Sequence, residues 1–362
     1  MMRCRSHRPS AALILLPALL YGALTAFATG AARAADVAAR EPHVALLLPL
    51  NSPSFSRHAD AVRQGFVTAA KVAGKDAPPI RIYAVNEDTL NVLAVYEAAV
   101  ESGAQLVVGP LTRNGVAALA ASNLVTVPTL ALNLLEPRTP QPPRLYLFGL
   151  AVEPEARQIA QLAFRDGRRN SFVVSDDTPL GKRMRQAFLE EFSGLGGNVV
   201  AEFSYGADPA SLNKLRLASN LGVADMVFLA LDYAHASTVR PYLANIPAVY
   251  ATSQVNAGKG PLAVRELNQV RFVDMPWLLQ ADHPAVMVYP RPRFGDEIDF
   301  ERLYALGIDA FRLGLELLRR NRDPVLDGVT GRISLTRAQQ FVRELPAAQF
   351  VDGKTVVFGE TR

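Results

Sequence analysis

Continuous apolar runs alternate with helix-like segments from residue 43 onward. Val44–Leu50 runs into Asn51 and Ser52, and Leu106–Leu111 runs into Thr112, and each run is followed by a segment with a 3.6-residue apolar period. An unalternating apolar run that ends in a Pro or Gly turn before such a segment is typical of a buried parallel strand feeding a crossover helix. Because the carboxyl ends of such strands line the crevice of open α/β sheets, the pattern predicts where a site lies.

The same pattern predicts two series of strands and helices. In the first, we expect strands at 43–50, 80–85, 105–109, 126–132 and 146–150 and helices at 58–74, 89–102 and 112–123. In the second, we expect helices at 153–166, 179–193, 209–220 and 233–243 and strands at 171–175, 198–204, 225–230 and 248–252. A return strand at 270–278, a helix at 299–320, a turn and strand at 327–335 and a hairpin at 350–357 follow.

These elements predict an α/β fold with two Rossmann-like lobes of parallel sheet, flanking helices and a cleft between the lobes. We expect lobe 1 at 43–147, completed by about 274–326, and lobe 2 at 148–273, completed by about 327–358. A chain of 362 residues exceeds what one core usually holds, which also favours two lobes.

The first 34 residues are typical of a secretory signal peptide. Four arginines and no acid surround an apolar stretch from Ala11 to Phe27, and Ala32-Arg33-Ala34 forms a small-x-small cleavage site. We therefore expect export to the periplasm, cleavage after about Ala34 and a short linker at 35–42. An uncleaved membrane anchor is the alternative, although the apolar stretch is short for a span.

Cleavage of the signal peptide would remove four arginines and the only cysteine from the chain. The whole chain carries a formal charge of +4, and loss of four arginines leaves 34 basic against 34 acidic residues, so we expect no affinity for nucleic acid. The only cysteine, Cys4, precedes the apolar stretch, and no cysteine follows it. We therefore expect no disulfide and no lipid anchor through a lipobox cysteine, although association with the outer membrane stays open.

The sequence offers no recognisable catalytic constellation. None of the five histidines pairs at the i, i+4 spacing of a helical zinc site, and no serine lies in a Gly-x-Ser-x-Gly motif. We expect no enzyme, no metal and no cofactor, and we find no acid, base and nucleophile for a peptidoglycan hydrolase.

Polar residues at the predicted strand ends are the candidates for a ligand cleft. Such groups can orient a small ligand through hydrogen bonds, whereas turn and helix-capping roles are the structural alternative for each of them. The acidic pair Asp176-Asp177 has two interpretations. Asp177 or Thr178 caps the following helix, or the pair contacts a cationic group of a ligand. The candidates are Asn51, Ser52, Thr112, Asn133, Asp176, Asp177, Asp232, Tyr233, Thr252 and Ser253.

Several segments resemble known periplasmic proteins. The first βα series, the Ser175–Gly181 segment and the Gly328–Gly331 turn resemble the type I periplasmic-binding-protein fold. More narrowly, Val107–Leu111, Val127–Asn133, Tyr250–Ser253 and above all Phe272–Leu279 are similar to penicillin-binding protein activators of the LpoA type. The resemblance covers essentially all of residues 43–350, but we expect no counterpart here of the N-terminal helical-repeat domain and lipid anchor of enterobacterial members.

The resemblance implies a non-enzymatic activator that promotes peptidoglycan synthesis by contacting a class A penicillin-binding protein. It also draws attention to Trp277, which is either a core anchor or the centre of a partner surface, since Trp is enriched at interface hot spots. A periplasmic solute-binding protein for an amino acid or similar small ligand remains the alternative function, and closure of the cleft on a ligand would make the two compatible.

Overall fold

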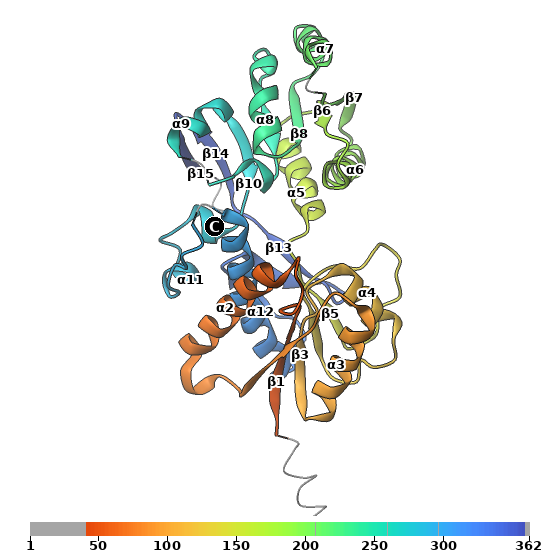
Figure 1. Ribbon diagram of the computed structural model, residues 1–362. Helices are drawn as coiled ribbons and strands as arrows, with labels where there is room; N and C mark the ends of the chain where they lie inside the picture. Colours follow the sequence, from red (N-terminus) through yellow and green to blue (C-terminus); the bar gives the residue numbers. More distant parts are fainter. Residues whose placement is uncertain (1–40, 207, 259, 296, 359–362) are drawn as a thin grey trace, which may run out of the picture.

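A computed structural model describes residues 41–206, 208–258, 260–295 and 297–358 of the protein. The predicted signal peptide, Cys4 and most of the predicted linker lie outside the described residues. Figure 1 shows two lobes that are joined where the chain enters α5 (Val152–Arg165) of the second lobe and beside β13 (Phe341–Glu344).

The first lobe is built on a parallel sheet with the strand order β2-β1-β3-β4-β5. Its strands are β1 (His43–Leu48), β2 (Ile80–Ala84), β3 (Ala104–Val108), β4 (Thr129–Ala131) and β5 (Leu145–Leu147). Its helices are α2 (Ser56–Ala73), α3 (Thr89–Glu101), α4 (Arg113–Ala121) and α12 (Ile298–Leu318). All six residues of β1 are buried, which explains why this strand is a continuous apolar run.

Alternate residues of β1 face two different cores. Leu46 packs in the cluster that contains residues of α2 and α12, whereas Leu47 packs with residues of α3 and α4. Helices α2 and α12 cross closely (Figure 1). The crossing is so close that a Cβ at Gly307 would lie only 2.1 Å from the Val62 carbonyl oxygen. Glycine at this crossing lets the two backbones meet.

The second lobe is built on a sheet with the order β15-β14-β10-β9-β8-β6-β7. Its strands are β6 (Asn170–Ser175), β7 (Asn198–Ser204), β8 (Met226–Ala230), β9 (Val249–Ala251), β10 (Val270–Val273), β14 (Ala347–Val351) and β15 (Lys354–Phe358). Its longer helices are α5 (Val152–Arg165), α6 (Pro179–Gly194), α7 (Pro209–Ser219) and α8 (Tyr233–Val239). Residues of α5 and α6 pack on one face of this sheet and residues of α7 and α8 on the other.

Three short helices lie between β9 and α12 in the chain, one of them before β10 and two after it. They are α9 (Pro261–Val264), α10 (Pro276–Leu279) and α11 (Pro284–Met287). The return strand predicted at 270–278 is therefore too long, because β10 ends at Val273. Pro276 occupies the first turn of α10, where a missing N–H group costs no hydrogen bond.

A third, antiparallel sheet with the order β11-β12-β13 lies beside the first lobe. It contains β11 (Val325–Gly328), β12 (Gly331–Leu335) and β13 (Phe341–Glu344), and a bridge between Leu147 and Gln340 connects it to β5. Within the segment expected to complete lobe 2, only β14 and β15 join the second sheet. The difference arises because the Gly328–Gly331 turn folds β12 back on β11, away from that sheet.

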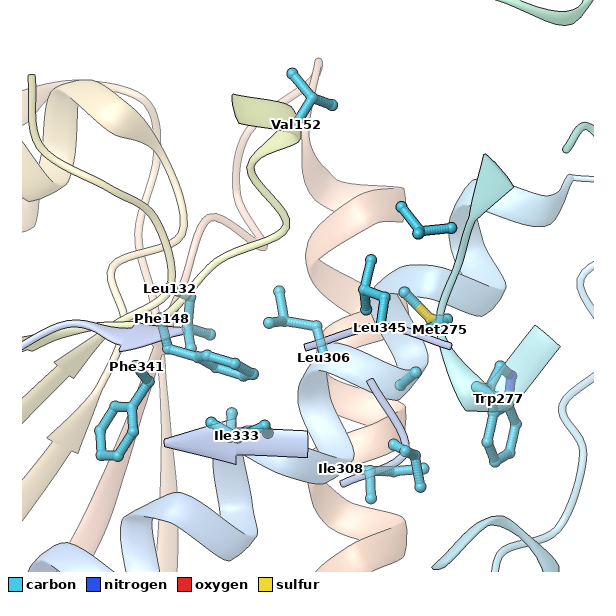
Figure 2. Packing of buried hydrophobic residues seen from close by; sticks show 14 of the residues in the cluster. Leu132, Phe148, Val152, Met275, Trp277, Leu306, Ile308, Ile333, Phe341 and Leu345 are labelled. Carbon is cyan, nitrogen blue, oxygen red and sulfur yellow. The ribbon is translucent and has the colours of Figure 1, made fainter. Parts of the chain in front are cut away.

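One apolar cluster continues from the first lobe across the crossing segments to the second. Figure 2 shows this cluster along α12, with Phe148 and Phe341 toward one end and Met275 and Trp277 toward the other. Because residues of both lobes share this core, the crossing segments are packed rather than free.

Candidate functional site

A cavity of about 490 Å³ lies between the lobes. The first lobe and α12 contribute one wall, the segment before α5 contributes the floor, and α6 contributes Leu180 and Arg183. Its volume falls within the range of small-ligand pockets. The apolar part of its lining includes Leu111, Leu132, Leu150, Leu180, Leu303 and Leu306.

The two arginines that line this cavity, Arg113 and Arg183, form ion pairs. Glu153 of α5 lies 3.1 Å from an Arg183 guanidinium nitrogen and 3.8 Å from that of Arg113 on α4, and Arg113 also pairs with Glu136 at 2.7 Å. The side chains of Arg113, Arg183 and Glu153 are between 23% and 38% exposed, so each pair contributes little stability. The cations that line the cavity are therefore already engaged by carboxylates of the chain.

Two polar atoms near the cavity have no hydrogen-bond partner among the described residues. They are Nδ1 of His58 and Oε2 of Glu153, and both atoms are buried. The His58 ring lies 5.2 Å from the ring of Phe300 and 6.2 Å from that of Phe55, measured between centroids. Unpaired buried polar atoms carry a desolvation cost, so these two atoms mark where a ligand or water would be accepted.

Two of the ten predicted cleft residues, Thr112 and Asn133, line the cavity. The Thr112 hydroxyl accepts a hydrogen bond from the Gly115 N–H at 3.2 Å and caps α4. The Asn133 side-chain amide donates to the Leu111 carbonyl at 3.0 Å. Both side chains thus hold the cavity wall in place through local bonds.

Ser52 and Asn51 are absent from the cavity lining. Ser52 is buried, and its hydroxyl donates to the carboxylate of Glu87, a residue that lines the cavity. This hydrogen bond is the main reason that the pKa of Glu87 lies below its usual value. Asn51 is exposed, and its N–H donates to the Val85 carbonyl at 3.0 Å.

The second-lobe acids are absent from the cavity lining and support helix starts. Thr178 caps α6, and Asp176 accepts hydrogen bonds from the Thr178 N–H at 3.1 Å and hydroxyl at 2.5 Å. Asp232 caps α8 by accepting from the His235 N–H at 2.9 Å. Asp177 is exposed, and Tyr233 lines a separate hollow of about 540 Å³. Of the two predicted caps, Thr178 rather than Asp177 fills the position.

Thr252 and Ser253 are both buried. The Thr252 hydroxyl donates to Sδ of Met184 at 3.2 Å, whereas Ser253 joins an ionic network at the lobe crossings. Ser253 donates its N–H to Glu155 at 3.2 Å, and its carbonyl accepts from Arg302 at 3.0 Å. Arg302 pairs with Asp274 at 2.9 Å, and Glu155 lies 3.5 Å from Arg343. Burial raises the pKa of Glu155 and lowers that of Arg343.

Sequence reasoning missed this network. Its members come from α5, β13, α12 and the end of β10, so no local spacing connects them. The available signal was the presence of charged residues at apolar positions: Asp274 interrupts an apolar run, and Arg302 shares a buried helix face with Ala305 and Leu306.

Trp277 corrects the expectation of a partner surface. Its side chain is completely buried, its indole N–H donates to Glu301 at 2.7 Å, and the Arg291 guanidinium lies 4.0 Å from its ring centroid. A side chain without exposed area offers no contact to a partner. Trp277 is instead a core anchor where the chain re-enters the first lobe, which was the structural alternative.

The described residues form neither a cluster of metal ligands nor a membrane-spanning helix. No group of three or more His, Cys, Asp or Glu side chains there is arranged to hold a metal ion. No helix there is long and apolar enough to cross a lipid bilayer.

Comparison with known proteins identifies the family. The family described as "LppC putative lipoprotein" matches residues 37–353. The chain belongs to the LppC family. This match covers the first lobe, the third sheet and all of the second lobe except β15, and it confirms the resemblance seen in the sequence.

Curated relatives of this LppC family chain are named penicillin-binding protein activator LpoA. One from Pantoea ananatis is 26% identical over 86% of this chain and 53% of its own length. Another, from Edwardsiella piscicida, is 29% identical over 76% of this chain and 46% of its own. The chain therefore spans about half the length of the curated relatives it matches.

Solved structures of similar fold cover most of this chain. The LpoA C-domain from Haemophilus influenzae, titled a regulator of PBP1A, shares 25% identity and a TM-score of 0.73, with 88% of this chain and all of that chain covered. A protein from Chromobacterium violaceum, titled a putative branched-chain amino acid ABC transporter, shares 39% identity and a TM-score of 0.74 over 85% of this chain and all of that one. These neighbours confirm the predicted two-lobed, type I periplasmic-binding-protein-like fold.

Proposed function

We propose that this chain is a non-enzymatic regulator that binds a class A penicillin-binding protein and promotes peptidoglycan synthesis through direct contact. The observation that carries the proposal is the family match over residues 37–353, together with the full coverage of the LpoA C-domain. The relatives that share this region carry the activator name.

The chemistry of the cleft supports a contact role over catalysis. Glu153 engages the two arginines that line the cavity, and Thr112 and Asn133 are committed to the backbone around them. Acid–base or nucleophilic catalysis requires a nucleophile with a base in hydrogen-bond reach, and the described lining offers no such pair.

A reconstituted crosslinking assay tests the proposal. The purified chain is added to a purified class A penicillin-binding protein and its lipid-linked substrate, and crosslinked product is measured beside a pull-down of the two proteins. We expect binding and faster crosslinking with the chain present, and no product from the chain alone. Absence of both binding and stimulation would refute the proposal.

We also propose that the chain is exported and carries no lipid on a lipobox cysteine. The arginine-flanked apolar stretch and the position of Cys4 support this. Intact-mass measurement of protein expressed with its full N-terminus tests it: we expect the mass of a chain that begins near Ala35. A mass increment equal to a diacylglycerol group would contradict it.

The volume of the inter-lobe cavity favours a second candidate function, binding of a small solute. The 39% identical neighbour described as a putative branched-chain amino acid ABC transporter supports this alternative. Native mass spectrometry of freshly purified protein and thermal-shift measurements with an amino-acid panel test it. A bound metabolite that is lost in a Thr112→Ala/Asn133→Ala variant would establish it, and the absence of both a bound metabolite and a thermal shift would exclude it.

A further inference from the structure

A second groove, with a volume of about 700 Å³, lies between α5 and the β12–β13 ladder. It shares no lining residue with the inter-lobe cavity. One wall is a face of α5, whose contributing residues recur every three or four positions, and the other is one face of the antiparallel ladder. The α5 residues are Pro154, Arg157, Gln158, Gln161 and Arg165, and the ladder residues include Arg332, Ser334, Val342 and Glu344.

The groove carries an excess of positive charge. Arg157, Arg165 and Arg332 line it, and none of them forms an ion pair with any residue that the structure describes. Arg343 also lines it but is engaged by Glu155 at 3.5 Å. Glu344 is the one carboxylate among the described lining residues, so three unpaired guanidiniums face a single acid. Such an arrangement attracts an anionic ligand.

The spacing of the arginines decides the size of that ligand. Arg157 and Arg165 are eight residues apart on α5, which corresponds to about 12 Å along the helix axis. One phosphate or carboxylate cannot contact both guanidiniums, whereas about four residues of extended peptide span this length. An extended chain with several carboxylates fits the charges.

The composition of the groove favours a peptide over a glycan or a nucleic acid. Among the described lining residues there is no aromatic side chain on which a sugar ring or base would stack. The planar guanidinium instead matches a carboxylate in a two-pronged pair. Ser334 and the side-chain amide of Gln340 add hydrogen-bonding groups suited to a peptide backbone.

We propose that this basic groove binds an extended acidic segment of the protein partner. The inference rests on the proposed function and gives the contact a location. Because Gln158 accepts from the Leu345 N–H at 3.1 Å and donates to its carbonyl at 2.6 Å, the two walls are tied together at a lobe crossing. The occupant therefore touches elements on both sides of that crossing.

Two triple variants and a matched control test the groove. Arg157→Glu/Arg165→Glu/Arg332→Glu reverses its charge, and the corresponding triple alanine variant removes it with less risk to folding. The control Lys75→Glu/Lys214→Glu/Arg322→Glu makes the same net change at exposed cations that form no ion pair with described residues. Circular dichroism and thermal unfolding establish that each variant is folded.

Binding is measured for two probes, a fluorescein-labelled hexaglutamate peptide and a purified class A penicillin-binding protein, at low and moderate salt. We expect both probes to bind the wild type, more weakly as salt rises, and to bind both groove variants at least about tenfold more weakly. The control should retain wild-type affinity. Inorganic phosphate at matched charge should compete poorly with the peptide.

The outcomes separate this inference from the proposed function. If the synthase binds the wild type and the groove variants equally, the groove assignment is wrong while the proposed function stands. If the peptide binds the wild type but not the groove variants, and the synthase does not bind the wild type at all, the proposed function fails while the groove remains a site for acidic peptides. If the groove variants and the control lose the same affinity for the probes, the effect comes from the net charge of the protein rather than from the groove, and the inference is overturned.

Discussion

Replacement of Arg302 by methionine should destabilise the protein by breaking a buried ion pair between lobes. The Asp274 side chain is 1% exposed, and its carboxylate lies 2.9 Å from an Arg302 guanidinium nitrogen. The same nitrogen donates to the carbonyls of Ser253 at 3.0 Å and Asn256 at 2.9 Å. Burial alone would lower the pKa of Arg302, but the nearby carboxylates of Asp274 and Asp299 outweigh burial and raise it.

The expected loss follows from what the substitution leaves behind. Methionine retains the apolar stem but leaves a buried carboxylate without its cation and two carbonyls without their donor. Removal of one partner of a buried pair costs about 3–5 kcal/mol in the free energy of unfolding. The exposed pair of Arg319 with Glu316 is the control, because its arginine is 63% exposed and loss of such a pair costs less than about 1 kcal/mol.

The single tryptophan makes the measurement direct. Trp277 is fully buried at a lobe crossing, so its emission reports unfolding of this region in a urea titration. Arg302→Met, Asp274→Asn, the double variant and Arg319→Met are compared. We expect the double variant to lose less than the sum of the single losses by at least about 1 kcal/mol. A loss below about 1 kcal/mol for Arg302→Met, or strict additivity, would refute the reasoning.

Three further predictions concern the helix crossing at Gly307, the phenol of Tyr250 and the indole of Trp277. Gly307→Ala should cost about 1–3 kcal/mol by forcing α2 and α12 apart, whereas Gly194→Ala, whose added Cβ meets no atom within 4 Å, should be neutral or stabilising in thermal unfolding. Burial, with the hydrogen bond to Asp166, raises the pKa of Tyr250 to about 12 from 10.0, so its contribution to stability should be lost as the pH rises from about 10 to about 12. Absorbance titration of wild type and Tyr250→Phe checks this, and a Tyr250 that titrates near 10 would contradict it. Trp277→Phe should lower the unfolding temperature by leaving Glu301 without its indole donor but leave synthase binding unchanged; weaker binding at full folding would restore the surface interpretation.

Local pattern predicted most of the secondary structure. The strand at 43–50 appears as β1 at His43–Leu48, and the helix at 299–320 appears as α12 at Ile298–Leu318. The predicted element boundaries were wrong where contacts with residues distant in the sequence determine where an element ends. The segment 270–278 is apolar enough for a strand, but Val273 is its last residue paired with β14, and Pro276 begins a helix. Periodicity does not report where a neighbouring strand stops.

The sequence by itself determined the two-lobed α/β architecture, because buried strands and amphipathic helices impose their periods on the chain wherever they occur. The family followed separately, from the resemblance of segments such as Phe272–Leu279. Only the tertiary structure decided which polar residues face the cleft. Strand ends looked equivalent in sequence, yet Thr112 and Asn133 line the cavity while Ser253 is buried beside Arg302. The basic groove and the ionic network likewise combine residues more than a hundred positions apart, and such juxtapositions follow from packing rather than from local pattern.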